Sequence, residues 1–222
     1  MSDIEARFQL EWPGFTLDVD LRLPGRGVTA LFGPSGSGKT TLLRCIAGLE
    51  RAPQGRLRVQ GQTWQDGRAW LPTHRRPIGY VFQEASLFPH LSVLGNLRYG
   101  LRRTRGPQRV SLEQAIDLLG IGHLLERMLD RLSGGQARRV MLARVLATGA
   151  QVLLLDEPTA DLDPAAAHEI MSVLRARADA GACVVVVLHA LDLALRHATR
   201  MAVLADGRIT ACGPTAEILA GA

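Results

Sequence analysis

The segment that most constrains the fold is a glycine-rich run, GPSGSGKT, at residues 33–40. The apolar run before it, Val28–Phe32, predicts a β-strand, and Thr40–Ala47 predicts a helix that ends at Gly48. Glycines in such a loop let backbone N–H groups turn inward around phosphate oxygens, and the positive end of the following helix points at the same oxygens. The alternative is a glycine-rich turn without a ligand, but the flanking strand and helix favour a phosphate-binding loop (P-loop).

The P-loop pattern also assigns chemistry to its residues. Lys39 is expected to reach the β- and γ-phosphates of a nucleotide, and the Thr40 hydroxyl to ligate Mg²⁺. Of the 26 Lys and Arg residues only Lys39 is a lysine, which suits a position where a compact ammonium is needed and a planar guanidinium would not fit. The predicted nucleotide-binding residues of this segment are Gly33, Pro34, Ser35, Gly36, Ser37, Gly38, Lys39, Thr40 and Thr41.

Strand and helix signals alternate along the chain, which predicts an α/β fold with a parallel sheet. Further strand signals lie at 8–23 (broken at Trp12-Pro13-Gly14), 56–70, 78–82, 152–155 and 183–188, and a hairpin at 201–211 turns at Asp206-Gly207. The pattern is helical from about Ser92 to Ala147, which predicts an inserted helical subdomain. Ser111 with Gln114 has the spacing of a helix capping box, and Asp163-Pro164 predicts the start of another helix.

Composition excludes several classes of protein. The longest strongly apolar run, Ala182–Leu188, is far shorter than the ~20 residues that a membrane span needs. Three widely spaced cysteines without a CxxC pattern suit a reducing cytosol. The net charge of +5 would suit nucleic acid, but the arginines are scattered and only 5% of residues are aromatic, so no nucleic-acid partner is expected.

Two carboxylates follow the apolar run Val152–Leu155 directly. In a parallel sheet they would lie at the carboxyl end of the strand, where ligands bind. Asp156 is expected to hold Mg²⁺ and Glu157 to act as the general base that polarises the attacking water. An acidic strand end by itself also suits a solvated turn or a helix cap, and the preceding P-loop favours the catalytic interpretation.

The sequence LSGGQ at residues 132–136 decides the class. Ser133 and Gln136 form a capping box for the helix that follows, and a capped helix start with two glycines is also an anion site. LSGGQ is the signature of ATP-binding cassette (ABC) proteins, and the chain resembles that family over 8–219. The resemblance implies a P-loop NTPase with a RecA-like parallel-sheet core, an antiparallel β subdomain, and a helical subdomain inserted at about 85–147, all within one domain, 1–222.

The resemblance also implies how ATP and Mg²⁺ would be held. In the family the signature residues, here Ser133, Gly134, Gly135 and Gln136, contact the γ-phosphate bound to the other subunit, so the ATPase works as a head-to-tail dimer.

Four further positions match other motifs of the family. Gln83 matches the glutamine that contacts Mg²⁺ and the attacking water, and His189 the histidine that contacts the γ-phosphate, although Ala190 stands where many members have Asp. Asp161-Leu162-Asp163 fits the D-loop at the dimer contact. Trp12 is expected to stack on adenine, with Phe15 as a competitor for that role.

Residues 76–100 are similar to ATPases of molybdate importers, which implies an importer motor for molybdate or a similar oxyanion. It would sit peripherally on the cytoplasmic face of the inner membrane, with permease subunits, a second copy of itself and, indirectly, an extracytoplasmic substrate-binding protein as partners. In importers a cluster like Leu87, Phe88, Pro89 and Leu91 borders the groove for the permease, although packing within the helical subdomain explains these residues equally well. Many such ATPases carry a further C-terminal oxyanion-binding domain, and with the chain ending at Ala222 we expect no regulation through one.

Three alternatives remain open at this stage. Importers of thiamine, sulfate or amino acids would use the same motifs. A soluble cassette ATPase acting on nucleic acid would usually carry a long coiled-coil insertion or two cassettes. A nucleotide-binding module that does not hydrolyse would lack Lys39, Glu157 or His189, which are all present.

Overall fold

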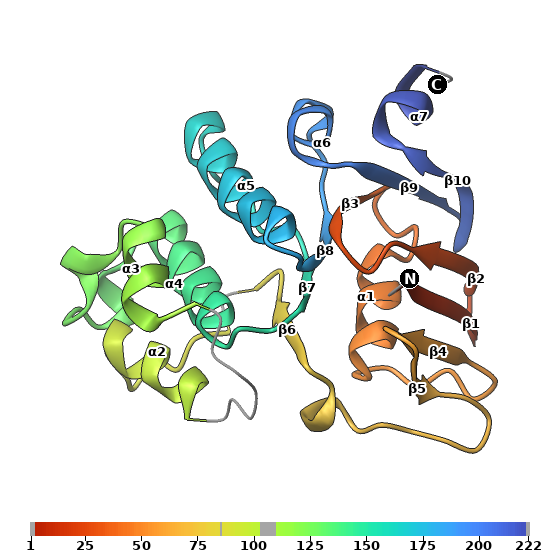
Figure 1. Cartoon of the computed structure of the whole chain (residues 1–222), viewed down its shortest axis with the longest axis horizontal. Coiled ribbons are helices and arrows are strands. Elements are labelled where there is room, and N and C mark those ends of the chain that lie inside the picture. Colours follow the sequence, from red (N-terminus) through yellow and green to blue (C-terminus); the bar gives the residue numbers. More distant parts are fainter. Residues whose placement is uncertain (1–2, 85, 103–109, 221–222) are drawn as a thin grey trace.

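The structure is a computed structural model that describes residues 3–84, 86–102 and 110–220. Two sheets lie on either side of helix α1 (Lys39–Ala47), and a lobe of helices is inserted between strands β6 and β7 of the larger sheet (Figure 1). The predicted first residue of the helical subdomain, Ala85, lies outside the described residues. Within the described ranges, no helix is both long and apolar enough to cross a membrane.

The smaller sheet is antiparallel, with the order β2-β1-β4-β5. Its strands are β1 (Ile4–Trp12), β2 (Phe15–Leu23), β4 (Arg56–Val59) and β5 (Gln62–Gln65). Alternate residues of β1 and β2 are buried against α1, as the sequence pattern predicts. The predicted strand pair at 56–70 ends earlier, at Gln65, because the Asp66 carboxylate accepts hydrogen bonds from the N–H groups of Arg68 and Ala69 and turns the chain.

The larger sheet has the order β10-β9-β3-β8-β7-β6. Its strands are β3 (Gly27–Phe32), β6 (Ile78–Val81), β7 (Val152–Leu155), β8 (Cys183–Val187), β9 (Arg200–Ala205) and β10 (Arg208–Pro214). All neighbours are parallel except β9 and β10, which form the predicted hairpin. Every residue of β7 and β8 is buried, because the sheet is covered on both faces.

The predicted helical region divides into shorter helices. In the described residues that region contains α2 (Val93–Leu101), α3 (Leu112–Leu118) and α4 (Gly134–Ala147), with 3₁₀ turns at 122–124 and 129–131. Outside it lie α5 (Pro164–Asp179), α6 (Leu191–His197), α7 (Thr215–Ala220) and a 3₁₀ turn at 73–75. Both predicted capping boxes are confirmed, at the starts of α3 and α4. Asp163 caps α5, and Pro164 is its first residue.

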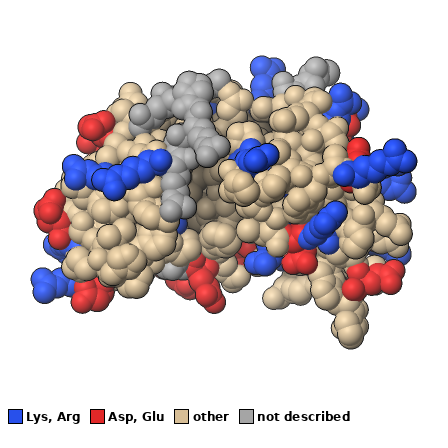
Figure 2. All heavy atoms as spheres, turned by 90° about the horizontal axis from the view of Figure 1, so that it is seen from below, with Lys and Arg blue, Asp and Glu red and all other residues tan. Residues whose placement is uncertain are grey.

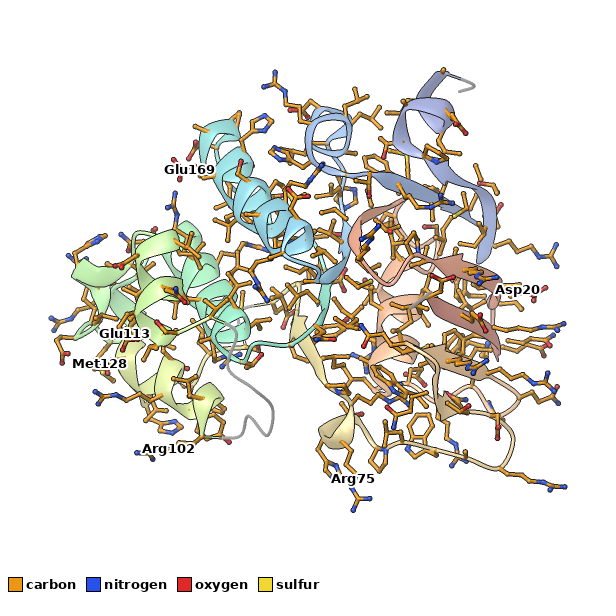
Figure 3. The ribbon with its side chains drawn as sticks, viewed as in Figure 1. Asp20, Arg75, Arg102, Glu113, Met128 and Glu169 are labelled. Carbon is orange, nitrogen blue, oxygen red and sulfur yellow. The ribbon has the colours of Figure 1, made fainter. Side chains whose placement is uncertain are left out.

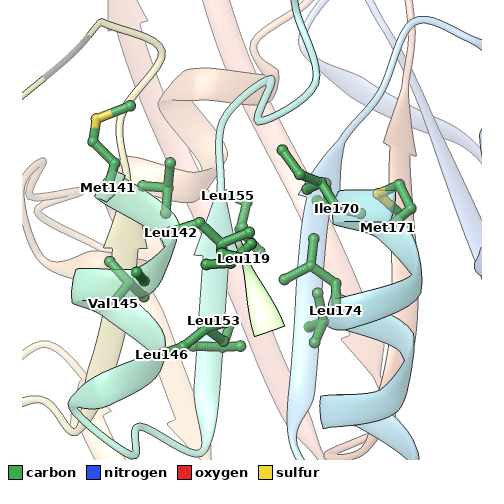
Figure 4. Packing of buried hydrophobic residues seen from close by; sticks show 14 of the residues in the cluster. Leu119, Met141, Leu142, Val145, Leu146, Leu153, Leu155, Ile170, Met171 and Leu174 are labelled. Carbon is green, nitrogen blue, oxygen red and sulfur yellow. The ribbon is translucent and has the colours of Figure 1, made fainter. Parts of the chain in front are cut away.

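The hydrophobic core has two halves, one on each face of the larger sheet. Leu153 and Leu155 of β7 pack toward α4 and α5, where Leu146 and Leu174 lie (Figure 4). Leu154 of β7 points to the opposite face, into the half that α1 shares with the smaller sheet. Helices therefore cover the faces of the sheet, and the loops at the carboxyl ends of its parallel strands are left to form a site.

Candidate functional site

The P-loop lies between β3 and α1, and its backbone requires glycine at two positions. Gly33 and Gly38 have positive φ angles of 147° and 102°. A Cβ atom at Gly33 would lie 2.0 Å from the Leu204 carbonyl oxygen, and one at Gly38 would lie 2.9 Å from the ring of Phe15. Gly38 is also the N-cap of α1 and makes no side-chain cap, so the N–H groups of the first turn are left to bind an anion.

Lys39 extends over the loop rather than toward solvent. Its ammonium donates to the carbonyl oxygens of Gly33 (3.0 Å) and Pro34 (2.8 Å) and lies 3.5 Å from the Ser37 hydroxyl. Only 6% of the residue is exposed. Burial lowers the pKa of Lys39, and the nearby Glu157 and Asp156 carboxylates oppose that shift. The charge that would bind phosphate is thus already inside the loop.

Asp156 is a buried carboxylate next to the start of α1. It is 2% exposed, and burial raises its pKa, although a hydrogen bond from Thr40 acts in the opposite direction. Its Oδ1 atom is buried without a hydrogen-bond partner. A buried carboxylate oxygen that lacks a donor, beside a threonine hydroxyl, fits a hard cation such as Mg²⁺. No group of three or more His, Cys, Asp and Glu residues in the described ranges could hold a metal alone, so phosphate oxygens and water would have to complete the shell.

Glu157 follows β7 and contacts residues that follow the two neighbouring strands of the larger sheet. Its Oε1 atom lies 2.7 Å from His189 Nε2, after β8, and its Oε2 atom accepts a 3.4 Å hydrogen bond from Gln83, after β6. The structure therefore brings together three residues that the sequence predicted separately. The Glu157 side chain is 18% exposed, and a basic imidazole nitrogen and an amide both face it, which suits a carboxylate that handles a proton.

The signature residues stand at the start of α4, in the helical lobe. The Ser133 hydroxyl accepts from the Gln136 N–H (3.3 Å), and the Gln136 side chain accepts from the Ser133 N–H (3.2 Å). Figure 1 shows α4 with α2 and α3 on one side of β6 and β7, and α1 on the other. Within one chain, then, the helix that follows the signature and the helix that follows the P-loop lie on opposite sides of β6 and β7.

The two aromatic candidates for stacking lie together at the tip of the β1–β2 hairpin. The rings of Trp12 and Phe15 are stacked, with their centroids 6.0 Å apart. Phe15 packs against Gly38 of the P-loop, while Trp12 faces outward and is 38% exposed. Phe15 therefore supports the loop, and Trp12 presents the more exposed of the two rings.

Two arginines that contact the elements of the site were not singled out from the sequence. Arg138, two residues after the signature, donates to the Glu157 carbonyl oxygen, and Arg76 donates to the Cys45 and Ile46 carbonyl oxygens at the end of α1. With 25 arginines in the chain, residue type gives no signal of which ones are buried.

Comparison with known proteins gives a family for this arrangement. Residues 17–160 match the sequence profile of the ABC transporter family. The chain belongs to that family. The matched segment contains the P-loop, Gln83, the signature and the two carboxylates, whereas Trp12, Asp163 and His189 lie outside it.

Two relatives of known description are consistent with this family assignment. The chain is 60% identical to a protein of Methylococcus capsulatus and 58% identical to one of Thiobacillus denitrificans, both described as molybdenum import ATP-binding protein ModC. These matches cover 99% and 98% of the chain, but the chain spans only 62% and 60% of the relatives' length.

Two solved structures support the fold. A nucleotide-free ATP-binding cassette from an ABC transporter has a TM-score of 0.84 at 24% identity, covering 100% of this chain and 96% of its own. A cassette solved as a dimer after hydrolysis, with ADP and Pi, has a TM-score of 0.80 at 26% identity, covering 96% and 98%.

Proposed function

We propose that the chain is the ATP-hydrolysing motor subunit of an ABC importer. The observation that carries this proposal is the Glu157 carboxylate, which His189 and Gln83 hold at the carboxyl ends of β7, β8 and β6, beside buried Asp156. An acidic turn with a purely structural role would not need His189 and the Gln83 amide on the Glu157 carboxylate. Residues 1–222 would act as one nucleotide-binding domain.

In this proposal each part of the site has one task. The P-loop N–H groups and Lys39 bind the phosphates of ATP, and the Trp12 ring stacks on adenine. Thr40, Asp156 and Gln83 hold Mg²⁺, which when bound neutralises phosphate charge. Glu157 accepts a proton from the attacking water, while His189 contacts the γ-phosphate and orients the carboxylate.

The signature needs a second copy of the chain. Because the helices that follow the signature and the P-loop lie on opposite sides of β6 and β7 in one chain, we propose a head-to-tail homodimer in which each signature closes the partner's nucleotide site. The dimeric cassette with ADP and Pi supports this arrangement. The subunit would bind permease subunits at the cytoplasmic face of the membrane, and through them an extracytoplasmic binding protein.

Molybdate is the proposed cargo, because the relatives that cover 98–99% of the chain are described as molybdenum import proteins. On the face shown in Figure 2, basic and acidic side chains are interspersed and do not form a basic stripe.

One substitution tests the motor. Glu157→Gln keeps the shape of the side chain but removes the base, so ATP binding should survive while turnover falls by a factor of about 10² or more. The variant should then form an ATP-bound dimer that light scattering detects. A variant that stays monomeric with saturating Mg·ATP would contradict the head-to-tail dimer, and one that turns over ATP at the wild-type rate would contradict the role of Glu157.

The cargo is tested in cells. Cellular molybdenum at limiting molybdate should fall when Lys39→Ala replaces the wild-type chain and recover with excess molybdate. Unchanged molybdenum in cells that lack other uptake routes would exclude molybdate as the cargo and leave the ATPase proposal standing.

A further inference from the structure

Arg138 links the signature helix to the catalytic loop of the same chain. It lies in the second turn of α4, and its Nη1 atom donates a 2.5 Å hydrogen bond to the backbone carbonyl oxygen of Glu157. Its Nη2 atom lies 3.8 Å from the Asp161 carboxylate. The Arg138 side chain is only 13% exposed, whereas that of Asp161 is 94% exposed, so the exposed ion pair contributes little and the carbonyl is the main partner.

The loop that Arg138 contacts has an unusual backbone. Glu157 and Asp161 have φ angles of 50° and 58°, in the left-handed region that residues with side chains seldom adopt. Such conformations persist only when the surroundings compensate for their cost. The Glu157 carbonyl accepts from the Ala160 N–H (3.2 Å) as well as from Arg138, so the guanidinium helps to fix the peptide plane that follows Glu157. Fixing that plane restrains the ψ angle of Glu157 and with it the direction of the Cα–Cβ bond from which the side chain extends.

The same loop also touches the signature itself. A Cβ atom at Gly135 would lie 3.1 Å from a Leu162 methyl group, so the first turn of α4 packs closely on the residue after Asp161. The start of α4 and the loop 157–162 are therefore joined at two points, by packing at Gly135 and by a partly buried hydrogen bond at Arg138.

We propose that Arg138 is a positioning residue for ATP hydrolysis: it holds Glu157 in its catalytic orientation and makes that orientation depend on where the signature turn stands. The inference rests on the proposed function. Arg138 acts through the backbone of Glu157 and does not contact the nucleotide. If the signature turn moved away from the loop 157–162, the hydrogen bond from Arg138 to the Glu157 carbonyl would break, and the Glu157 carboxylate would lose its catalytic orientation.

Steady-state hydrolysis by the purified chain with saturating Mg²⁺ tests the inference. Arg138→Met keeps the stem of the side chain but removes its donors, so kcat should fall about 10- to 100-fold while the KM for ATP stays within about 3-fold, because misplacing a catalytic group has effects of that size. Arg138→Lys retains one donor and should recover part of the loss. It also serves as the test variant if Arg138→Met does not fold.

Arg139→Met is the matched control. Arg139 is the next residue of α4, but it donates to the Leu119 carbonyl and to Glu169 of α5, which Figure 3 labels at the outer side of that helix. Its kcat should stay within about 3-fold of the wild type, since neither partner belongs to the site.

A double variant separates positioning from a general structural role. If Arg138 acts through the Glu157 carboxylate, Arg138→Met should slow Glu157→Gln no further, within about 2-fold. An equal loss in both backgrounds, a loss of ATP binding, or a wild-type kcat in Arg138→Met would overturn the inference and leave the ATPase proposal intact. A wild-type chain that does not hydrolyse ATP would refute both.

Discussion

Arg76 gives the most direct quantitative test of how the P-loop helix is held. Its guanidinium donates to the carbonyl oxygens of Ile46 (2.7 Å) and Cys45 (3.1 Å) at the end of α1, and to that of Leu71 (2.9 Å). The residue is 4% exposed, and burial lowers its pKa to about 10, so it remains charged at pH 7. Positive charge at the end of a helix is favourable, because the carbonyl groups there are partly negative.

Two tryptophans hold the guanidinium in place. Its Cζ atom lies 4.7 Å from the ring centroid of Trp70 and 5.6 Å from that of Trp64, within cation–π range. Arg76 therefore fastens α1, which carries Lys39 at its other end, to the segment between the two sheets.

The expected cost of Arg76→Met follows from these contacts. The Cys45 carbonyl keeps the Gly48 N–H as a partner, so two carbonyls lose a charged donor, at about 1–3 kcal/mol each. The cation–π contacts add about 1 kcal/mol, and the removal of a buried charge offsets part of the total. A net loss of about 3 kcal/mol should lower the Tm of a chain of this size by roughly 6–12 °C.

Thermal unfolding followed by circular dichroism measures this loss. Arg75→Met is the control, because Arg75, which Figure 3 labels, is an exposed neighbour of Arg76 in a 3₁₀ turn. Its Tm should change by no more than about 1–2 °C. If Arg76→Met and Arg75→Met unfold at the same temperature, the anchoring of α1 by Arg76 is refuted.

Three further outcomes are expected. Asp156→Asn should abolish turnover yet raise the Tm at pH 7 by a few degrees. Burial raises the pKa of Asp156, so at pH 7 the ionised carboxylate destabilises the folded state, and the neutral amide removes that cost; a lower Tm would contradict this reasoning. Trp12→Ala should weaken ATP binding about 10-fold in a fluorescence titration, as expected for a lost stacking contact, and unchanged affinity would return the adenine role to Phe15. Burial and the neighbouring His168 lower the pKa of His197, so as the pH falls below about 6.5 the unfolded chain takes up a proton before the folded one does. The Tm should therefore drop between pH 7.5 and 5.5, and less so in His197→Asn; equal drops would exclude this histidine as the cause.

The local parts of the site could be predicted from the sequence because their partners are close in the chain. The P-loop needs positive φ angles that glycine supplies, and each capping box closes between residues three apart. A continuous apolar run such as Val152–Leu155 indicates a strand buried on both faces, which the structure confirms. These features were fixed by residue type and spacing alone.

Only the tertiary structure decided how these parts meet. Gln83 and Glu157 are 74 residues apart in the sequence, and they meet because β6 and β7 are neighbours in the parallel sheet. The same holds for Arg138, which reaches the Glu157 carbonyl across 19 residues, and for Arg76, which reaches α1 across 30. An arginine in a sequence gives no sign of whether its guanidinium will be solvated or buried on a carbonyl, because that depends on which backbone groups the fold leaves without partners.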